Sequence, residues 1–189
     1  MIGKGPAWIA VAAAAAVLLA GGGYAEVAET PKLVEAEPVL RVPAADYRRD
    51  WVQLGIYSVL ADNPADGAKK IHAVYTAPEN VGAYLETGMF PDGAVLVKDV
   101  WHAKSAELTT GTVSYEDTLE GRFVLVKDRS GKLRSGPRFG DGWGWAFFPR
   151  DETARTSTTD YKADCLGCHE PARQTDLVYV QGYRVLRNR

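Results

Sequence analysis

The longest apolar run of the chain lies near its amino terminus and predicts a targeting segment. Residues 8–20 (WIAVAAAAAVLLA) are 13 consecutive apolar residues that follow a single positive charge at Lys4. A membrane-spanning helix needs about 20 such residues, whereas the apolar core of a signal peptide has about 7–15. Small residues precede a cleavage point between Ala25 and Glu26. We therefore expect residues 1–25 to be a cleaved signal peptide, with an uncleaved amino-terminal anchor as the alternative.

After this segment the hydrophobic pattern changes period several times. Residues 26–45 contain prolines and no sustained period, which predicts an extended lead-in. Apolar residues at near-helical spacing over residues 46–60 predict a helix. Residues 70–75 are rich in branched and aromatic side chains, which favours a strand. A short helix is expected to begin at Pro78 and to end at Gly88.

The middle of the chain has the pattern of strands connected by turns. The strand-like runs are residues 94–101, 111–115, 122–127 and 143–148, with turn sequences at residues 90–93 and 128–131. No helical pattern separates one run from the next, so an antiparallel sheet is expected. In the last run large aromatic residues alternate with small ones, which favours core packing. A wall of a pocket near the two cysteines that follow in the chain is the alternative. A helix at residues 160–172 and a short strand at residues 177–180 complete a predicted α+β fold, mainly antiparallel β-sheet with a few helices.

Composition places the chain among ordinary globular proteins. It has 189 residues, of which 46% are hydrophobic and 24% charged, with a formal net charge of −2. This length and composition permit one domain with a real core, which we place at residues 46–189. The charged residues show no clustered basic excess, so nucleic-acid binding is not expected.

The two cysteines give the clearest chemical signal. Cys165-Leu166-Gly167-Cys168-His169 has the form C-x-x-C-H, the signature of haem c attachment. Two thiols at this spacing can each bond one vinyl group of a porphyrin, and the adjacent histidine can bind the iron from the proximal side. We therefore expect one covalently bound haem c, with Cys165 and Cys168 as attachment sites and His169 as axial iron ligand. Residues 160–172 would then be a carboxyl-terminal haem-attachment helix.

Three other interpretations of the cysteines are weaker. A structural zinc site needs about four ligands, and only His72 and His102, far upstream, could complete one. A thioredoxin-type pair is expected near a β-α-β pattern, whereas this motif follows a run of strands. A disulfide at this spacing would close a strained small loop.

The sixth coordination position of the iron has no obvious occupant in the sequence. Met89 is the one methionine left once the signal peptide is removed, and it lies in a turn-like segment. His72 and His102 are the other strong ligands, although such histidines more often lie on a strand or at the surface. The sequence favours a five-coordinate iron with an open face. Such an iron suits ligand binding or catalysis better than simple electron transfer.

From about residue 47 to its end, the chain resembles the cytochrome P-460 family, which includes the cytochromes c′-beta. The resemblance rests on YRRDW (47–51), FPDGAVLVKD (90–99), FVLVKD (123–128), GDGWGWAFF (140–148) and DYKADCLGCH (160–169). It implies a mostly antiparallel β fold, a homodimer and a five-coordinate haem c. Some family members oxidise hydroxylamine or nitric oxide and have a lysine bonded to the haem edge. The cytochromes c′-beta lack that bond and bind nitric oxide or carbon monoxide in an apolar pocket.

The resemblance also points to individual residues outside the haem motif. The cross-linking lysine corresponds to Lys98, in the strand that follows FPDG. The family's distal arginine and acid have no anchored counterpart. The candidates for these two roles are Arg48, Arg49, Glu116 and Glu120.

The pattern around Lys98 leaves two interpretations open. Alternation along its strand places Lys98 on one face with Leu96 and Val100. An amine in that apolar setting would have a lowered pKa, and a neutral amine is a nucleophile that could attack an oxidised porphyrin edge. The other interpretation is a lysine whose amine reaches solvent at a sheet edge. Lys127 occupies the equivalent place in the second VLVKD string.

Three functions follow from these features and stay open. The first is a haem oxidoreductase acting on hydroxylamine or nitric oxide. The second is a non-catalytic cytochrome of c′-beta type that binds nitric oxide or carbon monoxide, and the third is an electron-transfer cytochrome. The expected partners are a small nitrogen-containing or gaseous ligand, a redox partner cytochrome and a second copy of the chain. The expected location is the periplasm, with a membrane-anchored protein facing the periplasm as the alternative.

Overall fold

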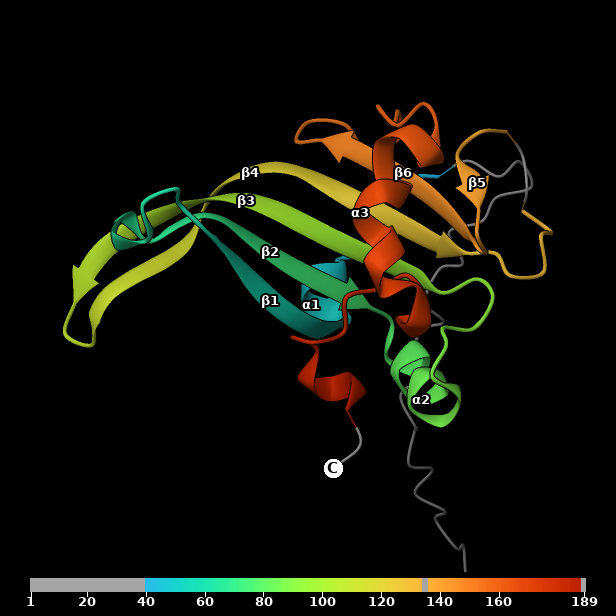
Figure 1. Cartoon of the computed structure of the whole chain (residues 1–189), viewed down its shortest axis with the longest axis horizontal. Coiled ribbons are helices and arrows are strands. Elements are labelled where there is room, and N and C mark those ends of the chain that lie inside the picture. Colours follow the sequence, from blue (N-terminus) through green and yellow to red (C-terminus); the bar gives the residue numbers. More distant parts are fainter. Residues whose placement is uncertain (1–39, 134–135, 188–189) are drawn as a thin grey trace, which may run out of the picture.

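The computed structural model describes residues 40–133 and 136–187, in which one six-stranded antiparallel sheet carries short helices (Figure 1). The strand order is β1-β2-β3-β4-β6-β5. The strands are β1 (Val52–Leu60), β2 (Ala68–Thr76), β3 (Val95–Leu108), β4 (Gly111–Lys127), β5 (Phe139–Gly140) and β6 (Trp143–Pro149). The helices are α1 (Tyr47–Asp50), η1 (Pro64–Asp66), α2 (Pro78–Thr87), η2 (Lys162–Leu166), α3 (Gly167–His169), η3 (Glu170–Thr175) and η4 (Arg184–Leu186). The predicted α+β class, mainly antiparallel with a few helices, is confirmed.

The sheet is strongly curved, and β3 and β4 project beyond the other strands as a long hairpin (Figure 1). Where the projecting part begins, the pairing shifts: Val100 lies opposite Gly121, but Trp101 lies opposite Leu119. Glu120 is therefore an extra residue on β4. Such a bulge increases the local twist and bends the strand, which accounts for part of the curvature.

Both faces of the sheet are covered, and each covering forms its own hydrophobic core. On one face, Leu96, Leu125 and Trp145 pack with residues of the carboxyl-terminal helical segment, which crosses in front of the sheet in Figure 1. On the other face, Val97 and Val124 pack with Tyr47, Trp51 and other residues at the start of the described chain. Because side chains alternate along a strand, the continuous apolar run of β3 supplies both cores.

Several predicted elements are confirmed. The strand at residues 70–75 is the centre of β2, and the short helix after it is α2, which ends where Gly88 adopts a left-handed conformation with φ 72°. Glycine adopts this conformation without a Cβ clash, so it is a favoured helix terminator. The helix expected around the cysteines is present as the continuous helical segment η2–α3–η3.

Three predicted elements are wrong. The helix at residues 46–60 is only the single turn of α1, and the rest of that segment is β1. The runs at residues 111–115 and 122–127 are one strand, β4. No strand forms at residues 177–180, because Asp176 and Leu177 both adopt left-handed conformations with φ 61° and turn the chain instead. A left-handed residue breaks the extended geometry that a strand requires.

The predicted signal peptide and the first part of the predicted lead-in, residues 1–39, lie outside the described residues. The end of the lead-in is described, and there Leu40 and Val42 are buried against the sheet. Among the helices that the structure describes, none has the length and apolar character needed to cross a membrane.

Candidate functional site

A cavity of about 320 Å³ lies between one face of the sheet and the carboxyl-terminal segment. The sheet contributes Tyr57, His72, Val74, Leu96, Lys98, Phe123 and Leu125. The opposite wall is formed by Cys168, His169, Val178, Tyr179 and Tyr183. Among the described residues that line the cavity there is no aspartate or glutamate. The site is therefore a mainly apolar space lined also by one cysteine, two histidines, one lysine and three tyrosines.

Local hydrogen bonds fix the helical segment that carries the motif. The Asp164 carboxylate accepts the backbone N–H of Thr159 at 2.8 Å and that of Asp160 at 3.2 Å, just before the helical segment begins. Asp160 in turn accepts the N–H of Lys162 at 2.7 Å. Such bonds satisfy donors that the first turn of a helix leaves free. They hold the start of the segment, so the helix presents its thiols in a defined direction.

The two thiols have different surroundings. Cys165 is buried in the core on the cavity side, whereas Cys168 lines the cavity, and neither is in a disulfide. Burial is the main cause that raises the pKa of the Cys165 thiol to about 11. A thioredoxin-type pair works through a thiol of lowered pKa, so this interpretation of the motif is not favoured. In the described part of the chain, no group of three or more metal-ligating side chains comes together.

His169 is held by contacts on several sides. Its Nδ1 lies 2.7 Å from the carbonyl oxygen of Leu177, and its ring meets that of Trp145 edge-on with 4.9 Å between centroids. Burial lowers the pKa of His169, which favours the neutral imidazole. With Nδ1 donating to a carbonyl, Nε2 keeps its lone pair, as a metal ligand requires.

Lys98 lies in the cavity wall, opposite Val74 on β2 and Phe123 on β4. Its amine lies 4.3 Å from the centre of the Phe123 ring, and burial lowers the pKa of the amine. The structure therefore places Lys98 in the same cavity as Cys168 and His169. Lys127, the equivalent residue of the second VLVKD string, forms an ion pair with Asp176 instead.

The three candidates for a sixth iron ligand are dispersed. His72 lines the cavity, while His102 is exposed on β3 with its Nε2 3.8 Å from a Glu120 carboxylate oxygen. The Met89 sulfur lies 3.3 Å from a guanidinium nitrogen of Arg129, at a separate pocket. Burial, with added repulsion from Lys98 and Lys70, lowers the pKa of His72 to about 4. His72 is thus a neutral imidazole in the cavity wall, a position the sequence did not indicate.

None of the four candidates for a distal arginine or acid is among the described residues that line the cavity. Arg48 donates to Asp99 at 2.6 Å, in the core on the other face of the sheet. Arg49 is exposed next to Asp46, and Glu120 forms an ion pair with Lys70. The pKa of Glu116 is raised by burial and by the nearby charge of Asp99. On the sheet side of the cavity, the basic groups are His72 on β2 and Lys98 on β3.

These features fit a haem group attached through C-x-x-C-H. The cavity is apolar, the motif brings a thiol and a neutral histidine to its wall, and the sheet closes the opposite side. Fold and site together define a haem protein of the c-type cytochrome class built on an antiparallel sheet, not on a helical bundle.

Comparison with protein families agrees with this class. The Cytochrome P460 family matches residues 44–180, which is 137 of the 189 residues, and the chain belongs to this family. This is a haem-binding family, and covalent haem c is consistent with it. A search of curated proteins gives no match.

Some residues of the site were not found from the sequence. Trp145 belongs to the aromatic alternation that predicted core packing, and it is 1% exposed, but its contact with His169 had no signal of its own. Tyr179 donates from its hydroxyl to the Cys168 carbonyl at 2.6 Å. The Trp145 contact depends on how β6 and the helical segment meet, and the Tyr179 contact depends on the turn that folds the chain back after that segment; hydrophobic periodicity encodes neither.

Proposed function

We propose that the chain is a mono-haem c-type cytochrome that oxidises hydroxylamine or nitric oxide at an open iron face. Cys165 and Cys168 would hold the haem covalently, and His169 would be its axial ligand. The observation that carries the proposal is that Lys98, Cys168 and His169 line one cavity. A bound haem would supply the iron at which the small nitrogen compound binds and loses electrons.

The residues around the cavity have separable roles in this proposal. His169 would hold the iron through Nε2, because its Nδ1 is engaged with the Leu177 carbonyl. The aliphatic residues and Phe123 exclude water from the ligand space. His72 is neutral at physiological pH and can accept or donate a proton at the cavity wall.

Lys98 is proposed to lie against the haem edge and to be bonded to it. Its pKa is lowered by burial, which raises the fraction of neutral, nucleophilic amine. Forming an N–C bond there replaces one amine N–H and one ring-edge C–H. The two protons and two electrons released must be taken up by a two-electron oxidant of the peroxide class, which is reduced to water.

A second candidate is the non-catalytic binding of nitric oxide or carbon monoxide. It is favoured by the aliphatic part of the cavity wall, formed by Val74, Leu96 and Leu125. An apolar pocket suits a small uncharged gas. In this case Lys98 would contribute only its amine–aromatic contact with Phe123.

The absorption spectrum of the ferrous protein, with and without carbon monoxide, separates these functions. A cross-linked haem should give a band far to the red of a normal Soret band, which the oxidoreductase proposal predicts. An ordinary five-coordinate spectrum that changes with carbon monoxide supports the gas-binding cytochrome. A six-coordinate spectrum that carbon monoxide leaves unchanged contradicts both and favours electron transfer.

We further propose that the protein is exported to the periplasm, acts as a homodimer and exchanges electrons with a redox partner cytochrome. Export is supported by the apolar run and cleavage point at residues 1–25. A homodimer is supported by exposed apolar side chains, among them Leu108 and Tyr115 on the projecting hairpin and Ile56 on β1. Light scattering of the purified holoprotein tests the dimer, which a monomeric mass would exclude.

A further inference from the structure

We propose that the buried ion pair between Lys127 and Asp176 is a positioning device for His169. The pair holds a left-handed turn whose next carbonyl, that of Leu177, receives the hydrogen bond from His169. The inference rests on the proposed function in one respect, namely that His169 is the axial ligand. Lys127 and Asp176 are positioning residues in this account, because neither side chain lines the cavity.

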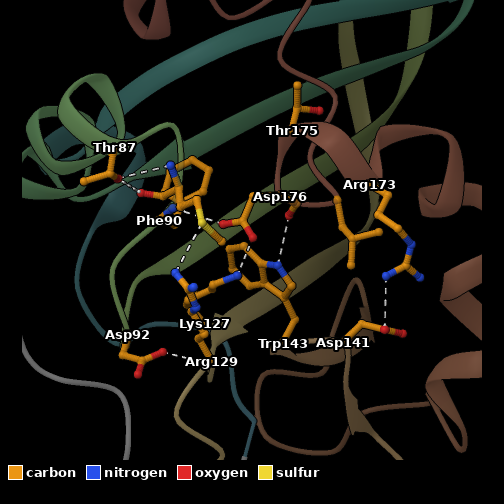
Figure 2. A network of polar contacts seen from close by, with 12 residues as sticks. Thr87, Phe90, Asp92, Lys127, Arg129, Asp141, Trp143, Arg173, Thr175 and Asp176 are labelled. Carbon is orange, nitrogen blue, oxygen red and sulfur yellow. Dashed lines mark hydrogen bonds and ion pairs between the residues drawn. The ribbon is translucent and has the colours of Figure 1, made fainter.

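The pair is buried and held from several elements. The Lys127 side chain, at the end of β4, is 2% exposed and forms an ion pair with Asp176, which is 5% exposed (Figure 2). The second carboxylate oxygen of Asp176 accepts the backbone N–H of Phe90 at 3.0 Å. The Trp143 indole donates to the Asp176 carbonyl at 3.0 Å, and the Lys127 amine lies 4.4 Å from the centre of that ring.

The turn that the pair holds has an unfavourable backbone conformation. Asp176 and Leu177 both have φ 61°. Aspartate tolerates this region, but leucine rarely adopts it because its Cβ approaches the backbone. Such a conformation persists only where the surroundings over-determine it. Two sets of contacts hold it here. The backbone N–H groups of Asp176 and Leu177 donate to the Ala172 carbonyl at the end of the helical segment, and Asp176 adds the ion pair, the Phe90 contact and the Trp143 contact, which tie the turn to the sheet.

The turn matters to the site because it directs the Leu177 carbonyl toward His169. The Leu177 carbonyl lies 2.7 Å from His169 Nδ1, so the residue after the ion pair supplies the acceptor. An acceptor at Nδ1 fixes the tautomer and orientation of an axial histidine and raises its basicity as a ligand. If the Nδ1 hydrogen bond is longer or misdirected, the histidine donates less electron density to the iron. The reduced state of the iron is then favoured.

The alternative is that the pair only stabilises the fold. A buried ion pair is weak support for stability, since apolar residues of similar volume often serve as well. The chain offers a matched control on the other face of the sheet. Asp99, whose side chain is fully buried, pairs there with Arg48 and accepts from the Tyr47 hydroxyl at 2.7 Å. That carboxylate is equally buried, and its hydrogen-bond and ion-pair partners in the described part of the chain, Tyr47, Arg48 and Arg122, lie outside the motif.

The experiment compares Asp176→Asn, Lys127→Met and Lys127→Arg with Asp99→Asn in the haem-loaded protein. Asparagine keeps the shape of Asp176 and tolerates a left-handed φ, so that variant should fold. The readouts are the iron–histidine stretching frequency of the ferrous form and the reduction potential. We expect Asp176→Asn and Lys127→Met to lower the frequency and raise the potential. Lys127→Arg, which keeps the charge, should stay closer to wild type.

The control variant decides what the result means. Asp99→Asn should lower the unfolding temperature but leave both the frequency and the potential as in wild type. The inference is overturned if Asp176→Asn and Lys127→Met lose stability with unchanged frequency and potential, or if Asp99→Asn shifts both to the same extent. Failure of the premise that His169 is the axial ligand looks different, because the wild-type protein itself would then show no iron–histidine band. Failure of the oxidoreductase activity alone would leave that band, and with it this test, intact.

Discussion

The amine of Lys98 lies 4.3 Å from the centre of the Phe123 ring, inside the cavity that Cys168 and His169 also line. The two residues are direct partners across β3 and β4, so the sheet register fixes their contact. An amine enclosed by an aromatic ring and aliphatic neighbours loses hydration, and its pKa is lowered by burial. This relationship distinguishes Lys98 from a lysine that extends into solvent.

Peptide mapping of the holoprotein should show Lys98 attached to the haem. After digestion, the haem should travel with the peptide that holds Cys165 and Cys168 and also with the peptide that holds Lys98. Lys98→Met should remove the second peptide and return the ferrous Soret band to its ordinary position. Lys104→Met, at an exposed place on the same strand, is the control and should change neither. Attachment through the cysteine peptide alone would leave the gas-binding function as the better account.

Replacement of His169 by alanine should abolish the normal iron spectrum, because its Nε2 is the proposed ligand. By contrast, alanine at Met89, His72 or His102 should leave the spectrum unchanged. His72 is the sharpest of these tests, since its side chain lines the cavity. A clear spectral change from any of the three would show that the face opposite His169 is not open.

His72 should make the protein sensitive to acid. Its pKa is lowered from 6.5 to about 4 in the folded protein, mainly by burial. A group with a lowered folded-state pKa contributes its full stability above its unfolded pKa, so the contribution is lost as pH falls from about 6.5 to about 4. The loss should amount to at most about 3 kcal/mol. Denaturant unfolding measures the free energy of unfolding across this pH range. That free energy should fall less steeply with decreasing pH for His72→Gln than for wild type.

His102→Gln is the control for that comparison, because His102 is exposed. It should follow the wild-type pH profile. Equal slopes for wild type and His72→Gln would mean that the imidazole of His72 is not held neutral in the folded state.

The amino terminus of the exported protein should be Glu26. The 13-residue apolar core and the small residues before the cleavage point support this position. Amino-terminal sequencing of the periplasmic fraction measures it directly. Recovery of the full-length chain in the membrane fraction would favour the amino-terminal anchor.

The sequence predicted those parts of the fold that depend on local pattern. The strand at β2, the end of α2 at Gly88 and the helix around the cysteines each have a short-range signal. The segment of β1 was assigned wrongly because Trp51 and Leu54 are spaced as on a helix. In the structure Trp51, directly before β1, and Leu54, within it, belong to different cores on opposite faces of the sheet. Spacing alone does not distinguish one helical stripe from two strand faces.

The residues of the site were likewise predictable only where they have a local sequence signal. The motif residues are contiguous, so the sequence could name them, and alternation placed Lys98 on one face of its strand. The roles of His72, Trp145 and Leu177 depend on sheet register and on a turn that two left-handed residues form. Neither Asp176 nor Leu177 is a glycine, so the usual sequence sign of a left-handed turn is missing there. A short strand was predicted in its place.

The central claim is that Cys165 and Cys168 hold one haem covalently, and the intact mass of the exported protein tests it most directly. The protein should be produced with the haem-attachment machinery and measured after acid-acetone treatment, alongside a Cys165→Ser, Cys168→Ser double variant. We predict that the wild-type mass equals the mature chain plus one haem and that the colour stays with the protein, whereas the double variant has the mass of the chain alone. A wild-type protein that loses its colour to the solvent and has the mass of the bare chain would contradict the account.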